Sequence, residues 1–118
     1  MWCNEMKANV DRVGASEILR TVPSDQSFLF FEDIGKYTGR LAANLDQFYE
    51  IIRTLDTKSL TFHFRRGDYE KWIKESLHDA QLTQRLKRIK KSSSEEELRN
   101  KILQTIRKRL DELHEMLR

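Results

Sequence analysis

The stretch SLTFHFRRGDYEKWI, residues 59–73, is the part of the chain that decides most about its fold. It holds four aromatic side chains, one histidine, one glycine and a cluster of charges within fifteen residues. Such a density of large rings and a single imidazole is typical either of a reactive site or of a crowded part of the core. The residues around the stretch help to distinguish the two.

The first half of this stretch, residues 59–66, fits two secondary structures. As a strand, Leu60, Phe62 and Phe64 would alternate with polar side chains. As a helix, Leu60, His63 and Phe64 would line one side. Side chains with capping oxygens precede the stretch and favour the helix, but the alternation leaves the strand as an alternative.

The second half predicts a turn and a new helix. Gly67 should end the first element, and Asp68 is expected to cap a helix that carries Tyr69 and Trp72. Each large ring contributes about 1.5–3 kcal/mol when it is fully buried. We therefore interpret His63, Asp68, Tyr69 and Trp72 as a structural core motif, with His63 partly buried against the rings.

The residues before the stretch predict a short helix and a small hairpin. Residues 15–22 have helical spacing, and Pro23 ends that helix. The aromatic run at residues 27–34 favours a strand, and residues 40–43 would return as a second strand. The sequence GKYTG, residues 35–39, is the predicted turn between them.

Capping signals predict three further helices. Asn44 followed by Gln47 forms a variant capping box before a stripe of apolar residues. Asp79 is expected to cap the next helix. Ser93 or Ser94, each followed three residues later by a glutamate, starts the last one.

Composition agrees with a mainly α (α+β) fold, a small two-stranded β-hairpin packed against four to five helices. The chain has 118 residues, of which 38% are hydrophobic and 35% charged, with one proline and four glycines. This length suits one domain, and few helix breakers favour helices. We expect a loosely ordered N-terminal segment at residues 1–14 and a single compact domain at residues 15–118.

The cysteine count and the hydropathy pattern limit which covalent and metal sites the protein can contain and where in the cell it is expected. Cys3 is the only cysteine, so no internal disulfide and no cysteine-rich metal site can form. The start of the chain lacks the apolar core of a secretory signal, and no run reaches the roughly 20 apolar residues that span a bilayer. We expect a cytoplasmic protein without membrane contact.

Positive charge is concentrated in the middle of the chain. Residues 58–91 hold ten basic and four acidic side chains, a net charge of +6, whereas the whole chain carries +3. Such a run usually forms a solvated face, but it also suits a protein partner or the phosphates of a nucleic acid. The candidate anion- or nucleic-acid-binding residues are Arg65, Arg66, Arg85, Lys87, Arg88, Lys90 and Lys91.

Signals for catalysis, metals and cofactors are weak. His63 and Asp68 are close enough in sequence to pair, with Ser59 one helical turn away, but no nucleophile-elbow motif accompanies them. His63, His78 and His114 share no metal-ligand spacing. No phosphate-binding loop occurs. We therefore assign no catalytic residue, no metal and no cofactor, and an enzyme using His63 and Asp68 remains an alternative that requires an open cleft.

A series of short motifs is shared with a known family. They are the aromatic strand SFLFF, Tyr37-Thr38-Gly39, Ala42, Leu45, Phe48, Ser59-Leu60, Phe62-His63, Asp68-Tyr69, Trp72-Ile73, Asp79 and Leu82. Over about residues 15–115 the chain resembles a family of small prokaryotic, mainly archaeal, proteins that form a domain of unknown function. One departure is His78, where relatives usually have glycine. The resemblance implies no activity.

The leading hypothesis is a non-enzymatic binding or regulatory module that acts through a protein partner. It predicts a contiguous apolar patch on the last helix or beside the hairpin. Nucleic-acid binding through the basic segment at residues 85–91 is the first alternative. The protein would be a monomer, or a homodimer through heptad positions of the C-terminal helix, which are Leu103, Ile106, Leu110, Leu113 and Leu117.

Overall fold

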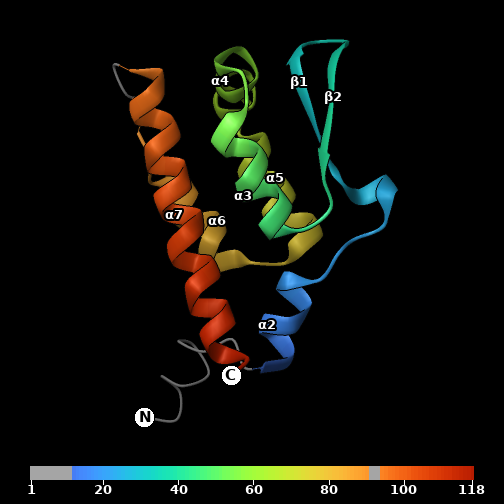
Figure 1. The fold of residues 1–118 in the computed structure, drawn as a ribbon, viewed down its shortest axis with the longest axis vertical. Helices are drawn as coiled ribbons and strands as arrows, with labels where there is room; N and C mark the ends of the chain where they lie inside the picture. The colour runs from blue at the N-terminus through green and yellow to red at the C-terminus, as the bar shows by residue number, and fades with distance from the viewer. Residues whose placement is uncertain (1–11, 91–93) are drawn as a thin grey trace.

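The computed structural model describes residues 12–90 and 94–118, and the fold is mainly helical with one antiparallel hairpin, as the sequence predicted (Figure 1). Cys3, Lys91 and Ser93 lie outside the described residues. The elements in chain order are α2 (Arg12–Leu19), the 3-10 turn η1 (Ser24–Gln26), β1 (Phe28–Asp33), β2 (Lys36–Ala42), α3 (Leu45–Thr54), α4 (Thr57–Arg66), α5 (Asp68–Trp72), the π-helical turn η2 (Ile73–Leu77), α6 (Ala80–Lys87) and α7 (Glu95–Met116).

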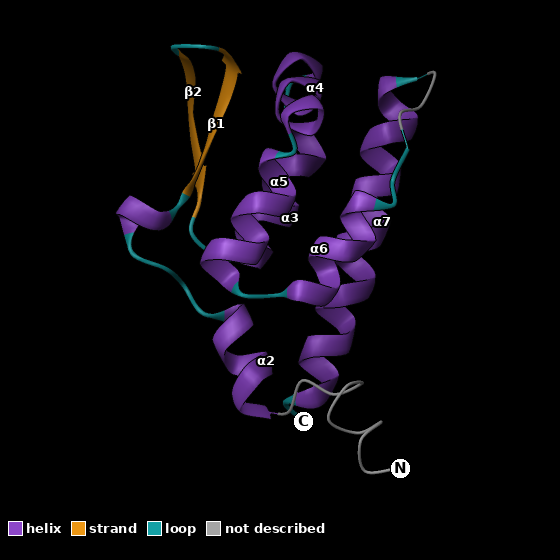
Figure 2. Cartoon of the chain, turned by 180° about the vertical axis from the view of Figure 1, so that it is seen from behind, coloured by secondary structure: helices purple, strands orange, loops and turns teal. Residues whose placement is uncertain are grey.

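The long helix α7 forms one side of the molecule and the hairpin forms the other. In both views α3 and α4 lie between them, and α2 packs beside the C-terminal end of α7 (Figures 1 and 2). The first helix begins at Arg12, three residues earlier than the sequence predicted, so residues 12–14 belong to α2 and not to a loose segment. The rest of the predicted loose segment lies outside the described residues.

Residues 59–66 form a helix, which decides between the two structures that the pattern allowed. Asp56 caps α4 by accepting a hydrogen bond from the Lys58 N–H, and Gly67 ends it in the left-handed conformation at φ 73°. The buried face of α4 consists of Ser59, Leu60 and His63. The phenylalanines of this helix lie at the edges of that face and are only half buried, so the main core aromatics come from other parts of the chain.

The hairpin has a shorter turn than the predicted GKYTG loop. Strand β2 begins at Lys36, so Ile34 and Gly35 alone connect the strands. Gly39 instead lies inside β2 at φ 85°, where the pairing register shifts. The hydroxyl of Thr38 donates to the Phe30 carbonyl at 2.7 Å beside this irregularity. A residue with positive φ in a strand is typical of a β-bulge, which explains why glycine occurs there.

Three of the predicted helix caps are confirmed, and one is wrong. Asn44, Asp79 and Ser94 each accept a hydrogen bond from the backbone N–H three residues later. Asp68, in contrast, is the first residue of α5 and makes no capping bond, because Gly67 occupies the cap position. Its carboxylate is therefore free to bond other side chains.

Aromatic rings from three parts of the chain meet in the core. Phe28 lies 4.7 Å from Phe30 between ring centroids, and Phe48 stacks on Trp72 at 5.4 Å. Phe48 also contacts Tyr69 edge to face at 5.5 Å. The polar ends of the two amphipathic rings are satisfied, since Tyr69 Oη donates to a carbonyl at 3.0 Å and Trp72 Nε1 to another at 2.7 Å.

The apolar stripe of α7 is used inside its own chain. Leu98, Ile102, Ile106, Leu110 and Leu113 are all buried against the rest of the core. This helix therefore packs on its own domain. Most of the heptad positions that a second copy would need are covered.

Candidate functional site

The backbone of Phe31 in β1 is held by two side chains from one face of α4. The Phe31 N–H donates to His63 Nε2 at 2.8 Å, and its carbonyl accepts from Ser59 Oγ at 2.7 Å. Ser59 and His63 are four residues apart and therefore lie on the same face of the helix. Together they supply the acceptor and the donor that a neighbouring strand would offer. We call Ser59, His63 and Phe31 the hairpin clamp.

The bonds of His63 fix its tautomer and charge. Nε2 accepts from the Phe31 N–H, so the ring proton is on Nδ1, which donates to Asp68 Oδ2 at 2.8 Å. Burial lowers the pKa of His63, although the hydrogen bond and charge of Asp68 act in the opposite direction. The residue is only 4% exposed, although His63 and Asp68 both line an adjoining pocket. In this arrangement both ring nitrogens are used inside the protein.

A pocket of about 480 Å³ opens between the hairpin and α4, α5 and η2. Pockets of about 300–1,000 Å³ with mainly apolar walls are typical of binding sites. Its apolar walls come from Phe28, Leu29, Phe31, Ile34, Phe62 and Trp72. We call this the hairpin pocket.

Charged side chains of both signs line the same pocket. Arg66 bonds Asp68 through Nε at 3.1 Å and lies over the Phe62 ring, 4.9 Å from its centroid. Lys71 and Glu75 also line it and make no ion pair with any residue in the described ranges. Arg66 is one of the predicted anion-binding candidates, but Asp68 already balances its charge.

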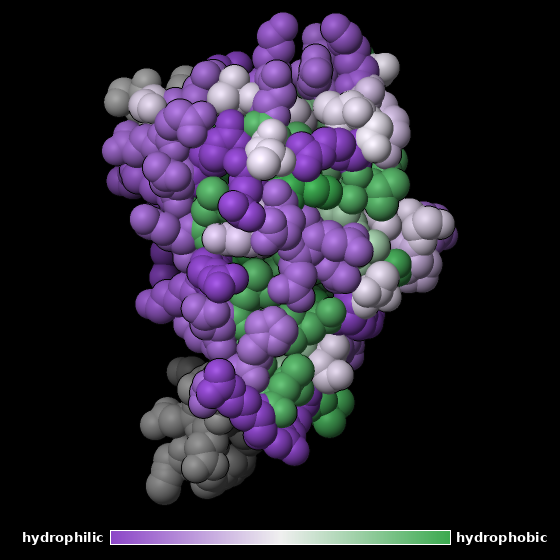
Figure 3. Space-filling view, viewed as in Figure 1, coloured by the Kyte–Doolittle hydropathy of each residue, from purple (hydrophilic) through white to green (hydrophobic). Residues whose placement is uncertain are grey.

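The outer face of the hairpin exposes a row of large apolar side chains next to this pocket. Leu29 and Leu41 are directly paired across the strands, and Phe31 contacts Tyr37 at 5.4 Å between ring centroids. Ile34 at the turn is 80% exposed. Figure 3 shows apolar residues reaching the surface on the hairpin side of the view, whereas the α7 side is mostly hydrophilic. We call Leu29, Leu41, Phe31, Tyr37 and Ile34 the hairpin patch.

The structure does not bring the basic candidates together. Arg66 lines the hairpin pocket, whereas Arg85, Arg88 and Lys90 line a separate hollow between α6 and α7. Arg65 and Lys87 are exposed and line neither. The spacing in the sequence therefore overstated the continuity of a single basic surface.

A buried ionic network that the sequence analysis missed joins α7 to the start of α6. Arg109 Nε donates to Asp79 Oδ2 at 2.8 Å and Nη2 to Asp79 Oδ1 at 3.1 Å. Glu112 accepts from Arg109 at 3.1 Å and is bonded by both terminal nitrogens of Arg85. Burial alone would lower the pKa of Arg109, but its bonds and charge contacts with Asp79 and Glu112 outweigh burial and raise it.

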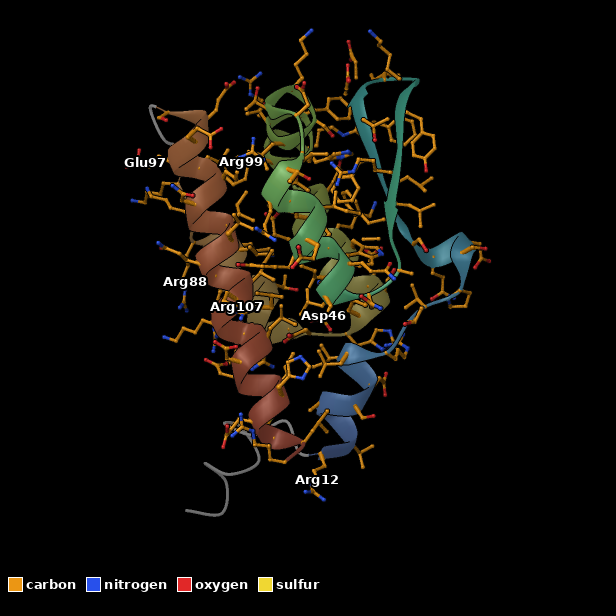
Figure 4. All side chains as sticks on the ribbon, in the orientation of Figure 1. Arg12, Asp46, Arg88, Glu97, Arg99 and Arg107 are labelled. Atoms are coloured by element: carbon orange, nitrogen blue, oxygen red, sulfur yellow. The ribbon has the colours of Figure 1, made fainter. Side chains whose placement is uncertain are left out.

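A sequence signal for this network exists in retrospect. Arg109 continues the apolar stripe of α7, because it is three residues after Ile106 and four before Leu113. A charged residue at an inward position requires a buried partner of opposite charge. Arg99 is a second charged residue at an inward position of α7. It is buried and donates to the Ile52 carbonyl at 2.8 Å, and Figure 4 shows it directed from α7 toward α3.

Two classes of feature are absent from the described residues. No group of three or more His, Cys, Asp or Glu side chains that could hold a metal ion occurs there. Within the same residues, no helix combines the length and the apolarity needed to cross a bilayer.

Comparison with known proteins gives one match. Residues 65–118 are similar to a family of unknown function (DUF5752). The matched part comprises the end of α4 and everything from α5 to α7, so it includes the Asp79–Arg109 pair and excludes the hairpin. No curated protein and no solved structure matches the chain. The match covers less than half of the chain and assigns it no activity.

Proposed function

We propose that this protein is a non-enzymatic module that binds a protein partner through the hairpin patch and the adjoining hairpin pocket. The observation that carries this proposal is the continuity of the two features: Leu29, Phe31 and Ile34 belong to both. Exposed apolar surface of this kind marks interaction sites. A pocket beside it would accept a large apolar anchor side chain of the partner, and the mixed charges of the rim suit a protein surface.

Several observations favour binding over catalysis. A general base needs a free lone pair within reach of a substrate, and both nitrogens of His63 are bonded within the protein. The hydroxyl of Ser59 is buried and donates to Phe31. We propose that His63, Asp68, Tyr69 and Trp72 act as scaffold, that the protein uses no cofactor, and that it works in the cytoplasm.

Binding experiments with matched surface variants test the proposal. The double variant Ile34→Asp/Leu41→Glu places charge on the hairpin patch, and Val13→Asp places charge on an apolar residue of α2 that is nearly as exposed as Ile34. Immobilised wild-type protein and the two variants would be compared for capture from extract of the native host. We expect a protein that the wild type and the Val13 variant capture and the hairpin variant does not.

The same set of proteins distinguishes the alternatives. Thermal melting must first show that all variants are folded. Size-exclusion chromatography with light scattering would reveal whether the captured partner is a second copy, in which case the wild type forms a dimer that the hairpin variant loses. Capture that the hairpin substitutions leave unchanged, or no capture at all, would refute a binding surface there.

A further inference from the structure

The hollow between the end of α6 and the middle of α7 has an unusual lining. It has a volume of about 360 Å³, and its charged residues are Arg85, Arg88, Lys90 and Lys101. The remaining lining residues are Ile89, Gln104 and Thr105, so no carboxylate of the described residues 12–90 and 94–118 lines it. Lys101 comes from α7 and is brought here by the packing of α6 on that helix, which the spacing of the basic run alone did not predict. We call this feature the basic hollow.

The four cations of the basic hollow differ in whether a carboxylate neutralises their charge. Arg85 bonds both carboxylate oxygens of Glu112, at 2.9 and 3.2 Å, so its charge is paired and its side chain is held in place. Arg88, Lys90 and Lys101 make no ion pair with any residue of the described ranges. Glu97 precedes Lys101 by one helical turn but does not bond it. Figure 4 shows Glu97 near the N-terminal end of α7 and Arg88 projecting beside that helix.

The hollow therefore holds three unbalanced positive charges from two elements around one small space. Like charges that line one hollow repel one another, and folding has to overcome that repulsion. A bound anion would remove the repulsion and add charge-assisted hydrogen bonds. The amide of Gln104 offers a further donor at the same place.

We propose that the basic hollow binds a phosphate group. A phosphate has several oxygens and more than one charge near neutral pH, so it contacts three cations from different directions at once, which a single carboxylate does not. The group belongs either to a small phosphorylated molecule or to the backbone of a nucleic acid, since both offer the same chemistry. This site is separate from the hairpin patch, so the test of phosphate binding does not depend on whether the proposed function is correct.

Titration calorimetry with pyrophosphate and fluorescence anisotropy with a single-stranded oligonucleotide test the site, both at about 50 mM salt. The test variants are Arg88→Gln and Lys101→Gln, which remove exposed charges and leave the core intact. Lys108→Gln is the matched control, because it removes the same charge from the same helix at a residue outside the hollow. Lys101→Arg preserves the charge and should retain binding.

We expect each test variant to bind about tenfold more weakly, as the loss of one charge-assisted bond predicts, and the control to bind like the wild type. Binding of both probes at the same site supports the proposal and is checked by competition between them. Binding of the oligonucleotide alone supports it with a nucleic acid as the source. Failure of both probes to bind, or an equal loss in Lys108→Gln and Lys101→Gln, would overturn the proposal.

Discussion

Replacement of Asp79 by asparagine tests a buried ion pair of the fold, the one between Asp79 and Arg109. The substitution keeps the size of the side chain and an oxygen that can cap α6, but it removes the charge opposite Arg109. Both side chains of this pair are 1% exposed. After the change, the guanidinium of Arg109 would keep its bond to Glu112 and its bond to Oδ1 of residue 79, each at 3.1 Å, but its Nε would face an amide NH2 group in place of Oδ2.

The size of the effect follows from this geometry. Removal of one partner from a buried ion pair costs about 3–5 kcal/mol, because the other charge stays buried without its counterpart. The bonds that remain, to Glu112 and to Oδ1 of residue 79, offset part of that cost, so we expect a loss near the lower limit, about 3 kcal/mol. Stabilities of natural domains are only about 5–15 kcal/mol, so the variant would be close to unfolding.

Urea denaturation followed by circular dichroism measures the loss. The control is Asp111→Asn, which removes an exposed carboxylate 3.7 Å from Arg107 and should cost less than about 0.5 kcal/mol. The double variant Asp79→Asn/Arg109→Met should lose less than the sum of the two single losses, because it leaves no unpaired charge. A loss below about 1 kcal/mol in Asp79→Asn would refute the reasoning.

Three further predictions concern other parts of the core. Wild-type stability should fall as the pH drops below about 6.5. The pKa of His63 is lowered from 6.5 in the folded protein, so the unfolded chain takes up the proton first as the pH falls. Denaturant midpoints measured across this pH range test the prediction, and His63→Gln should make the midpoint less dependent on pH. His78→Gly should stabilise the protein, by no more than about 1 kcal/mol in the free energy of unfolding. The substitution removes the backbone strain of a non-glycine residue at φ 65°, and this gain exceeds the conformational entropy cost of glycine together with the loss of the contact with Glu17. Calorimetry that shows clear destabilisation would contradict this. Phe48→Ala should cost about 3–5 kcal/mol by urea denaturation, since Phe48 is fully buried among other rings, and a loss near 1 kcal/mol would mean that the cluster repacks.

Local signals in the sequence predicted local structure well. Helix caps depend on side chains within three or four residues, so Asn44, Asp79 and Ser94 could be identified without knowledge of the fold. The same approach failed at Asp68, because a glycine that ends one helix can also begin the next. The carboxylate then bonds His63, which lies five residues before it in the sequence.

Features that depend on contacts between distant residues could not be predicted in this way. The hairpin clamp joins Phe31 to His63 across 32 residues, and the Asp79–Arg109 pair spans 30. The pattern of a single helix does not show which backbone group or carboxylate its inward polar side chain will meet. The basic hollow has the same origin, since Lys101 joins the run at residues 85–90 only through the packing of α7 on α6.

The hairpin clamp also limits where a function can reside. A proton added to Nε2 of His63 would remove the acceptor of the Phe31 N–H, and the hairpin would lose a bond that attaches it to α4. Catalysis by this imidazole would thus loosen the wall of the pocket in which the reaction takes place. The scaffold role and a catalytic role compete for the same lone pair, and the fold assigns that lone pair to Phe31. Function is therefore expected on the surfaces that the fold leaves unpaired, the hairpin patch with its pocket and the basic hollow.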